Sequence, residues 1–248
     1  YASALRLALM LNAPSDQADM ALAIAVLHQK AGRVDSATAR YRQAGDLARR
    51  GGNLRAVATI ENNLAALTRE MGNSVAAFEH AHRALRAGRE LNHLRLQASA
   101  SANIGSLYVE RSEPDSAFVY LRAARSLFGT IGDNAGVAKI ANDLGVTFEL
   151  LGQRDSAIAV LVASARQAAA VRDAETEGAA YLNLGVTHER LQQQDSARHY
   201  FQRALAIRRS THDRVSEGRV LANIASMFAR LGHMDSAEAY ARTAREIG

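Results

Sequence analysis

The amino-acid sequence repeats itself with a period of 40 residues. At that spacing an aliphatic residue recurs with Asn or Asp before it and Gly or Ala after it, at Leu64, Ile104, Leu144, Leu184 and Ile224. The motif Asp-Ser-Ala recurs in the same frame, at 35–37, 115–117, 155–157, 195–197 and 235–237. A fixed period of about 20–50 residues indicates an array of small stacked units. The sequence therefore predicts six repeats, at about 15–54, 55–94, 95–134, 135–174, 175–214 and 215–248, after a remnant of an earlier repeat at 1–14.

Each repeat is expected to hold two helices. In the first helix the larger side chains follow the helical period, as at Tyr181, Leu184 and His188. Glycines that suit the left-handed end of a helix follow it, at Gly32, Gly72, Gly152 and Gly232. The Asp of each Asp-Ser-Ala motif is predicted to be the N-cap of the second helix, at Asp35, Asp115, Asp155, Asp195 and Asp235. Caps for the first helix of the next repeat are predicted at Asn53, Asp133, Asp173 and Asp213, and turns are predicted at Pro14 and Pro114.

These columns resemble the tetratricopeptide repeat, a helix–turn–helix unit. One repeat carries the family's large, Leu-Gly, aromatic, Ala, aromatic and Ala positions at Tyr181, Leu184, Gly185, His188, Ala197, Phe201 and Ala204. The resemblance implies an all-α fold, a single right-handed α-solenoid of stacked helix–turn–helix repeats over residues 1–248, with the first helices lining a concave groove. The 40-residue period exceeds the usual 34 or so and resembles the subfamily with lengthened helices, found in motor-cargo adaptors and in bacterial regulatory proteins.

Composition excludes several classes of protein. The 248 residues contain no cysteine, which rules out a disulfide framework, a thiolate zinc site and a cysteine nucleophile. No apolar stretch reaches the roughly 18 residues of a membrane-spanning helix. The first residues also lack the basic region of a signal peptide, so we expect a cytoplasmic protein.

The positive charge is mostly arginine, and the net charge of +5 is modest for this length. The predicted second helices carry arginines near their middles, at Arg42, Arg83, Arg122, Arg203 and Arg242. They form either a solvated convex face or a stripe that binds phosphates. Because no aromatic residues interleave with them for base stacking, we expect no nucleic-acid partner.

No catalytic or metal-binding arrangement has usable spacing. His188-Glu189 lacks the second histidine of an HExxH motif. His80 and His82 are two residues apart and point to different helix faces. We therefore predict that the chain is not an enzyme and has no catalytic residue, no metal and no cofactor.

The predicted binding site is a ladder of polar residues along the groove, at Asn63, Asn103, Asp143, Asn183 and Asn223. An amide both donates and accepts hydrogen bonds, so such a row suits the backbone of an extended peptide. Helical spacing adds neighbours on the same face, at Asn62, Arg69, Lys139, Asn142, Arg190, Arg219 and Arg230. The alternative is that each Asn bonds a neighbouring repeat and stitches the stack, and both roles are compatible.

Two functions follow from this site. The first is a protein–protein interaction scaffold that holds a peptide or a partner segment in its concave groove. The second is a regulatory or sensor segment of a larger bacterial signalling protein whose effector domain lies elsewhere in the same polypeptide. Stacked repeats need polar caps, so the uncapped ends suggest a piece of a longer protein, or else a terminus covered by a second copy.

Overall fold

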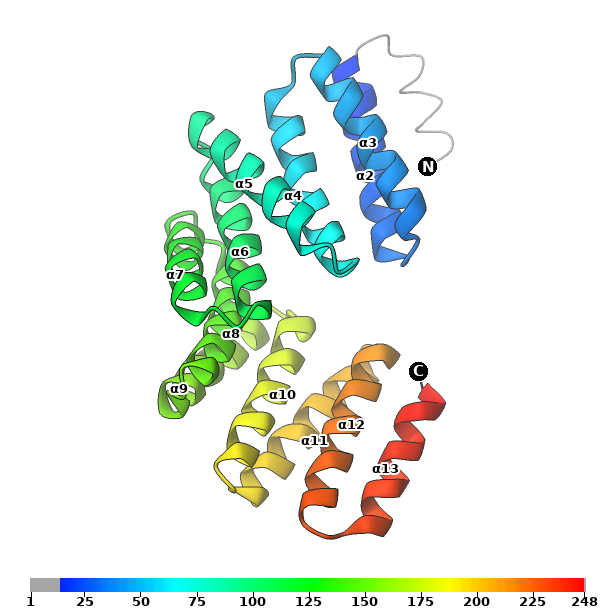
Figure 1. Ribbon diagram of the computed structural model, residues 1–248, viewed down its shortest axis with the longest axis vertical. Helices are drawn as coiled ribbons and strands as arrows, with labels where there is room; N and C mark the ends of the chain where they lie inside the picture. The colour runs from blue at the N-terminus through cyan, green and yellow to red at the C-terminus, as the bar shows by residue number, and fades with distance from the viewer. Residues whose placement is uncertain (1–13, 248) are drawn as a thin grey trace. The chain divides into compact units, whose positions relative to one another are not determined.

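The computed structural model describes residues 14–247 and is helical throughout, with short linkers (Figure 1). The predicted remnant at 1–14 lies, apart from Pro14, outside the described residues. The helices of the first half are α2 (Pro14–Lys30), α3 (Val34–Arg50), α4 (Leu54–Glu70), α5 (Ser74–Glu90), α6 (Leu94–Glu110) and α7 (Pro114–Thr130). Those of the second half are α8 (Asn134–Leu150), α9 (Arg154–Ala170), α10 (Ala174–Arg190), α11 (Gln194–Ser210), α12 (Arg214–Arg230) and α13 (Met234–Ile247).

The chain divides into two compact units, Tyr1–Leu127 and Phe128–Gly248. Within each unit consecutive helices pack as antiparallel pairs, and the first helix of one pair contacts the first helix of the next. The predicted all-α class of stacked helix–turn–helix pairs is confirmed. Among residues 14–247, no helix combines the length and the apolar composition needed to cross a bilayer.

The helix-ending turn has the same geometry at every linker. A 17-residue helix and a three-residue linker give 17 + 3 = 20 residues, half of the sequence period. The middle residue of each linker has a positive φ, which glycine adopts without strain. The predicted glycines at 32, 72, 152 and 232 occupy this position, with φ between 68° and 78°. Five linkers place another residue there, at Asn92, Ser112, Arg172, Gln192 and His212.

The predicted caps of the first helices are confirmed. The Asp173 carboxylate, for example, accepts a hydrogen bond from the Thr176 amide at 3.1 Å, and Asn53, Asp133 and Asp213 make the equivalent bond.

The predicted caps of the second helices are wrong, because each helix begins one residue before the aspartate. In α3, α9 and α11 the N-cap residue is Arg33, Gln153 or Gln193, and none of them makes a side-chain cap bond. Asp35, Asp115, Asp155, Asp195 and Asp235 lie instead in the first helical turn, where the positive end of the helix dipole favours an acid. Pro14 and Pro114 are likewise the first residues of α2 and α7 rather than turn residues.

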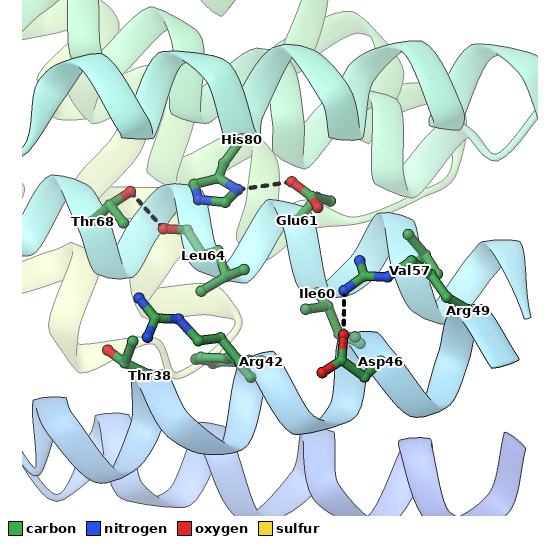
Figure 2. A pocket seen from close by; sticks show the side chains of 12 residues that line it. Thr38, Arg42, Asp46, Arg49, Val57, Ile60, Glu61, Leu64, Thr68 and His80 are labelled. Carbon is green, nitrogen blue, oxygen red and sulfur yellow. Dashed lines mark hydrogen bonds and ion pairs between the residues drawn. The ribbon is translucent and has the colours of Figure 1, made fainter. Parts of the chain in front are cut away.

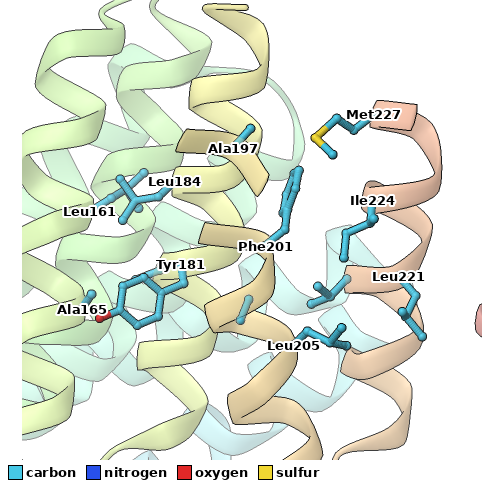
Figure 3. Packing of buried hydrophobic residues seen from close by; sticks show 13 residues of the cluster. Leu161, Ala165, Tyr181, Leu184, Ala197, Phe201, Leu205, Leu221, Ile224 and Met227 are labelled. Atoms are coloured by element: carbon cyan, nitrogen blue, oxygen red, sulfur yellow. The ribbon is translucent and has the colours of Figure 1, made fainter. Parts of the chain in front are cut away.

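In three of the pairs the two helices meet at a glycine, and in the others an alanine stands at the same position. A Cβ built on Gly105 would lie 2.7 Å from Leu121, and one on Gly145 would lie 2.5 Å from Leu161. Gly185 faces Phe201 in the same way. The alanine one turn earlier on the second helix, such as Ala197, is fully buried. Figure 3 shows Phe201 of α11 between Leu184 of α10 and Ile224 of α12, so one large side chain joins two repeats.

Candidate functional site

The polar ladder lies on the first helices, with its members half-buried near the middle of each helix. The Asn103 amide on α6 donates to the Asn62 side-chain oxygen on α4 at 3.0 Å and to the Asn62 carbonyl at 3.2 Å. The Asn183 amide on α10 donates to the Asn142 side-chain oxygen on α8 at 2.9 Å. These four predicted site residues therefore form two pairs that stitch neighbouring first helices.

The other ladder residues lie differently. The Asn223 amide donates only to the Arg219 carbonyl in its own helix, at 2.9 Å. Asn63 lies beside Tyr41, whose pKa rises to about 12 through burial and the charge of Glu70, against a hydrogen bond with Asn63. The Asn142 amide reaches Asp143 at 3.4 Å, and Lys139 is exposed on α8. The ladder is thus a set of separate arrangements rather than one uniform row.

Three of the four predicted arginines of this face are held by acids of neighbouring first helices, whereas Arg219 is exposed. Arg69 pairs with Glu110 at 2.8 Å, Arg190 pairs with Glu149 at 2.9 Å, and Arg230 pairs with Glu189. Each pair joins the penultimate residue of one first helix to the last residue of the next. The pairs fix the helices in register and leave most of this face's charge internally balanced.

Arg190 and Arg230 come together around one hollow. This hollow has a volume of about 310 Å³. It is lined by Glu189, Arg190, Gln192, Gln194, Met227, Arg230 and Leu231. It lies at the ends of α10 and α12 and combines exposed guanidinium groups with an apolar floor.

A second pocket was not predicted. This 340 Å³ pocket lies among α3, α4 and α5 (Figure 2). One oxygen of Glu61 accepts from His80 Nδ1 at 2.7 Å and from Arg83 Nε at 2.8 Å. Burial raises the pKa of Glu61, but these hydrogen bonds and the charges of Arg83 and His80 outweigh it, so that the pKa is lowered and the carboxylate stays ionised at neutral pH.

One feature of the sequence could have revealed this pocket. Glu61 stands in a repeat column whose other members are uncharged, at Ala21, Ser101, Ala141, Tyr181 and Leu221. The column faces the helix stack, where an acid is costly without partners. A charge at such a position points to a local network, although the column does not say which residues complete it.

The equivalent position of the second unit holds a pocket of about 450 Å³ among α9, α10 and α11. There Tyr181 and Tyr200 replace Glu61 and His80, 120 residues further along the chain. The two rings stack with centroids 6.1 Å apart, and the Arg203 guanidinium lies 4.3 Å from the centre of the Tyr181 ring. Arg83 and Arg203, expected on a free convex face, are therefore engaged with their own neighbours.

The histidines do not converge on a metal. His80 binds Glu61, whereas His82 packs between Phe78 and Tyr120. Burial, with the charges of Arg86 and Arg89, lowers the pKa of His82. No group of three or more His, Asp or Glu side chains placed to hold a metal ion occurs within residues 14–247.

The repeated helix pairs and the stitched first helices define a tetratricopeptide-type helical scaffold. A family model for the tetratricopeptide repeat matches residues 176–248. The described residues before this segment continue the same helix pairs at the same period.

Solved structures share the fold. BtubC (BKLC) from P. vanneervenii has 23% identity over 86% of this chain and 89% of its own, with a TM-score of 0.68. The Rap conjugation gene regulator of the plasmid pLS20, in complex with the Phr* peptide, has 13% identity over 92% and 72%, with a TM-score of 0.70.

A Signal Transduction ATPase with Numerous Domains from Pyrococcus horikoshii, which has a tetratricopeptide repeat sensor, is also similar. It has 15% identity over 96% of this chain and 36% of its own, with a TM-score of 0.73. No curated protein matches the sequence. At these identities the likenesses show the fold alone.

Proposed function

We propose that this chain is an interaction scaffold that binds an extended peptide or partner segment along the first helices α8, α10 and α12. The observation that carries the proposal is the hydrogen-bonded Asn183–Asn142 pair. The bond fixes both side chains and leaves some of their donors and acceptors open. Each amide side chain has two N–H groups and an oxygen with two lone pairs. The pair consumes one N–H of Asn183 and one lone pair of Asn142.

The remaining groups suit a peptide backbone. The Asn183 oxygen and the Asn142 N–H that does not reach Asp143 belong to half-buried side chains, and the Asn223 oxygen is left over after its amide binds Arg219. Because the stitching bond holds the Asn183 side chain in one orientation, less conformational freedom is lost when a ligand binds. Stitching and binding are thus two uses of the same side chain.

The hollow at Arg190 and Arg230 supplies a place for a side chain of the bound segment. Both guanidinium groups are more than half exposed although each pairs with a glutamate. Met227 and Leu231 line the same hollow and offer apolar contact. A bound segment with an acidic residue beside an apolar one would complement this lining. The fold shared with the Rap regulator that binds the Phr* peptide supports the proposal.

The test uses the whole chain as bait in lysate of the source organism, with single-residue variants. Asn223→Ala and Arg230→Ala should each weaken capture of the same protein by about 2- to 10-fold, the effect of one lost hydrogen bond. Gln202→Ala is the matched control, since it removes an exposed amide from the second helix α11. A protein captured equally by the parent and both site variants would place the binding surface elsewhere.

Asn183→Ala belongs in the same series with a second measurement. Because its amide also bonds Asn142, this variant should lose both capture and some resistance to urea. Loss of stability with unchanged capture would assign Asn183 to stitching alone.

A second candidate function is a regulatory or sensor segment of a larger signalling protein. The observation in its favour is the likeness to a multidomain ATPase with a tetratricopeptide repeat sensor, of which this chain matches 36%. Sequencing of the gene on both sides of the segment tests it, since an adjoining effector domain would support this function and a complete reading frame without one would exclude it.

A further inference from the structure

The pocket among α3, α4 and α5 contains, within residues 14–247, one cation without an acid partner and one carboxylate oxygen without a hydrogen-bond partner. Arg49 pairs with Asp46 at 2.8 Å, and Arg83 pairs with Glu61 at 2.8 Å. Arg42 also lines the pocket, and its guanidinium has no acid partner among residues 14–247. It is therefore the one lining cation of the described pocket that is free to bind an anion.

The open carboxylate oxygen belongs to Glu61, whose other oxygen is paired. His80 and Arg83 both bind the same oxygen, Oε2, which leaves Oε1 without a hydrogen-bond partner. The side chain is 16% exposed, so this oxygen is held in one position beside the pocket rather than free in solvent. A positioned carboxylate oxygen with an open lone pair favours an ammonium donor.

Between the two charges the pocket is apolar. Figure 2 shows Leu64 and Ile60 of α4 between Arg42 on the α3 side and Glu61 with His80 on the α5 side. Val57 extends this strip along the same helix. At about 340 Å³ the pocket is at the lower end of the roughly 300–1,000 Å³ typical of ligand sites. It suits a molecule the size of an amino acid or a dipeptide.

The pocket's shape comes from the repeat, and so does the arginine, since Arg122 and Arg242 stand at the position of Arg42, but the acid at Glu61 does not recur. In the equivalent pocket of the second unit, Val162 and Tyr181 stand at the positions of Arg42 and Glu61. The charges there, Arg166 and Glu177, come from positions one turn away on their helices. In the second unit the helices therefore stack without a charge at either position, and Glu61 is a half-buried acid in a column where the other repeats have uncharged side chains.

We propose that this pocket binds a small zwitterion: a molecule whose carboxylate pairs with Arg42, whose ammonium pairs with Glu61 Oε1, and whose aliphatic body lies on Leu64, Ile60 and Val57. A free aliphatic amino acid and an aliphatic dipeptide share this chemistry. The site uses none of the stitched asparagines and does not depend on the function proposed above.

Calorimetric titration of the full chain tests the proposal with leucine and leucyl-leucine as the two probes. At least one should bind, and the preferred probe identifies the source of the zwitterion. N-acetylleucine, which lacks the ammonium, and leucinamide, which lacks the carboxylate, should each bind about tenfold or more weakly than leucine, as expected for the loss of a charged hydrogen bond.

The variants separate binding from folding. Arg42→Gln should weaken binding by about tenfold or more without loss of helix content, because the side chain is exposed and unpaired. Arg50→Gln, an exposed arginine on the same helix outside the pocket, should bind like the parent. Absence of binding by both probes at millimolar concentration, equal binding by Arg42→Gln, or undiminished binding of N-acetylleucine would each overturn the proposal.

Discussion

At the scale of single residues, Glu61 and Arg208 are charges in columns that are otherwise uncharged, and each has local partners. Glu61 occupies a stack-facing column that is uncharged in the other repeats, and two donors from α5 balance it. Arg208 is only 5% exposed and is held by Asp213 at 3.3 Å and by the Glu175 carbonyl at 3.0 Å. Gly178 lies against the Arg208 side chain, where a Cβ would come within 3.0 Å of Nε. Each of these two charged side chains therefore has nearby residues that bind it or leave room for it.

The network at Glu61 should make the stability of the protein depend on pH. The pKa of Glu61 is lower in the folded chain than its ordinary value, so its stabilisation is complete above the unfolded-state pKa and is lost as the pH falls through the folded-state pKa. Glu61→Gln should therefore reduce the free energy of unfolding by about 1–3 kcal/mol at neutral pH. The difference from the parent should shrink in acid.

Urea unfolding followed by circular dichroism at several pH values measures this difference. Glu79→Gln is the control, because Glu79 is exposed and its ion pair with Arg83 is long, at 4.0 Å. It should leave stability nearly unchanged at every pH. If Glu61→Gln lowered the free energy of unfolding by the same amount at neutral and at acid pH, the ionisation of Glu61 would not be the source of the stabilisation.

At the scale of helices, the sequence predicts where elements lie better than where they begin. The Gly and Asp columns recur every 40 residues and locate each linker, because a left-handed turn and a first-turn acid have clear chemical preferences. The second helices begin two residues earlier than predicted because backbone bonds, such as Ala37 N–H to the Arg33 carbonyl, form without a side-chain cap. Asp35 and its equivalents are therefore displaced from the cap by two positions.

The site was predicted less well than the fold. Helical spacing places Asn62, Asn142 and Asn183 on the first helices, but it cannot show which partner an amide chooses. The choice depends on the rise between neighbouring helices, which brings residues 41 positions apart into contact. The Glu61 pocket depends on α3, α4 and α5 together, so no single helix pattern reveals it.

Two aspartate substitutions distinguish a helix that begins with a side-chain cap from one that has only an acid in its first turn. Asp173→Ala removes a side-chain cap from α10 and should cost about 0.5–2 kcal/mol of unfolding free energy. Asp155→Ala removes only a first-turn charge from α9 and should cost roughly 0.3–1 kcal/mol, screened by salt. Urea unfolding in low and high salt separates the two. If Asp155→Ala lowered the unfolding free energy as much as Asp173→Ala does, and equally in low and high salt, Asp155 would have to act as a cap.

At the scale of the whole molecule, the described chain consists of similar helix pairs. Each pair is stabilised by contacts with adjacent helices. Each large side chain at a pair contact, such as Phe201, packs within its own unit against residues of adjacent helices. In repeat arrays of this kind stability is a sum of repeat and nearest-neighbour contributions. A defect in one pair should therefore weaken nearby repeats more than distant ones.

Gly185→Ala tests this locality. The added Cβ would collide with the Phe201 ring and should cost about 1–3 kcal/mol through overpacking. Because the chain contains no tryptophan, Tyr120→Trp and Tyr240→Trp each supply a single fluorescent reporter, one in each unit. Gly185→Ala should lower the urea midpoint reported at 240 more than the midpoint reported at 120. Gly129→Ala, whose Cβ meets nothing within 4 Å, should lower neither. Equal shifts at both reporters would mean that the two units unfold as one, and the nearest-neighbour description would then fail for this chain.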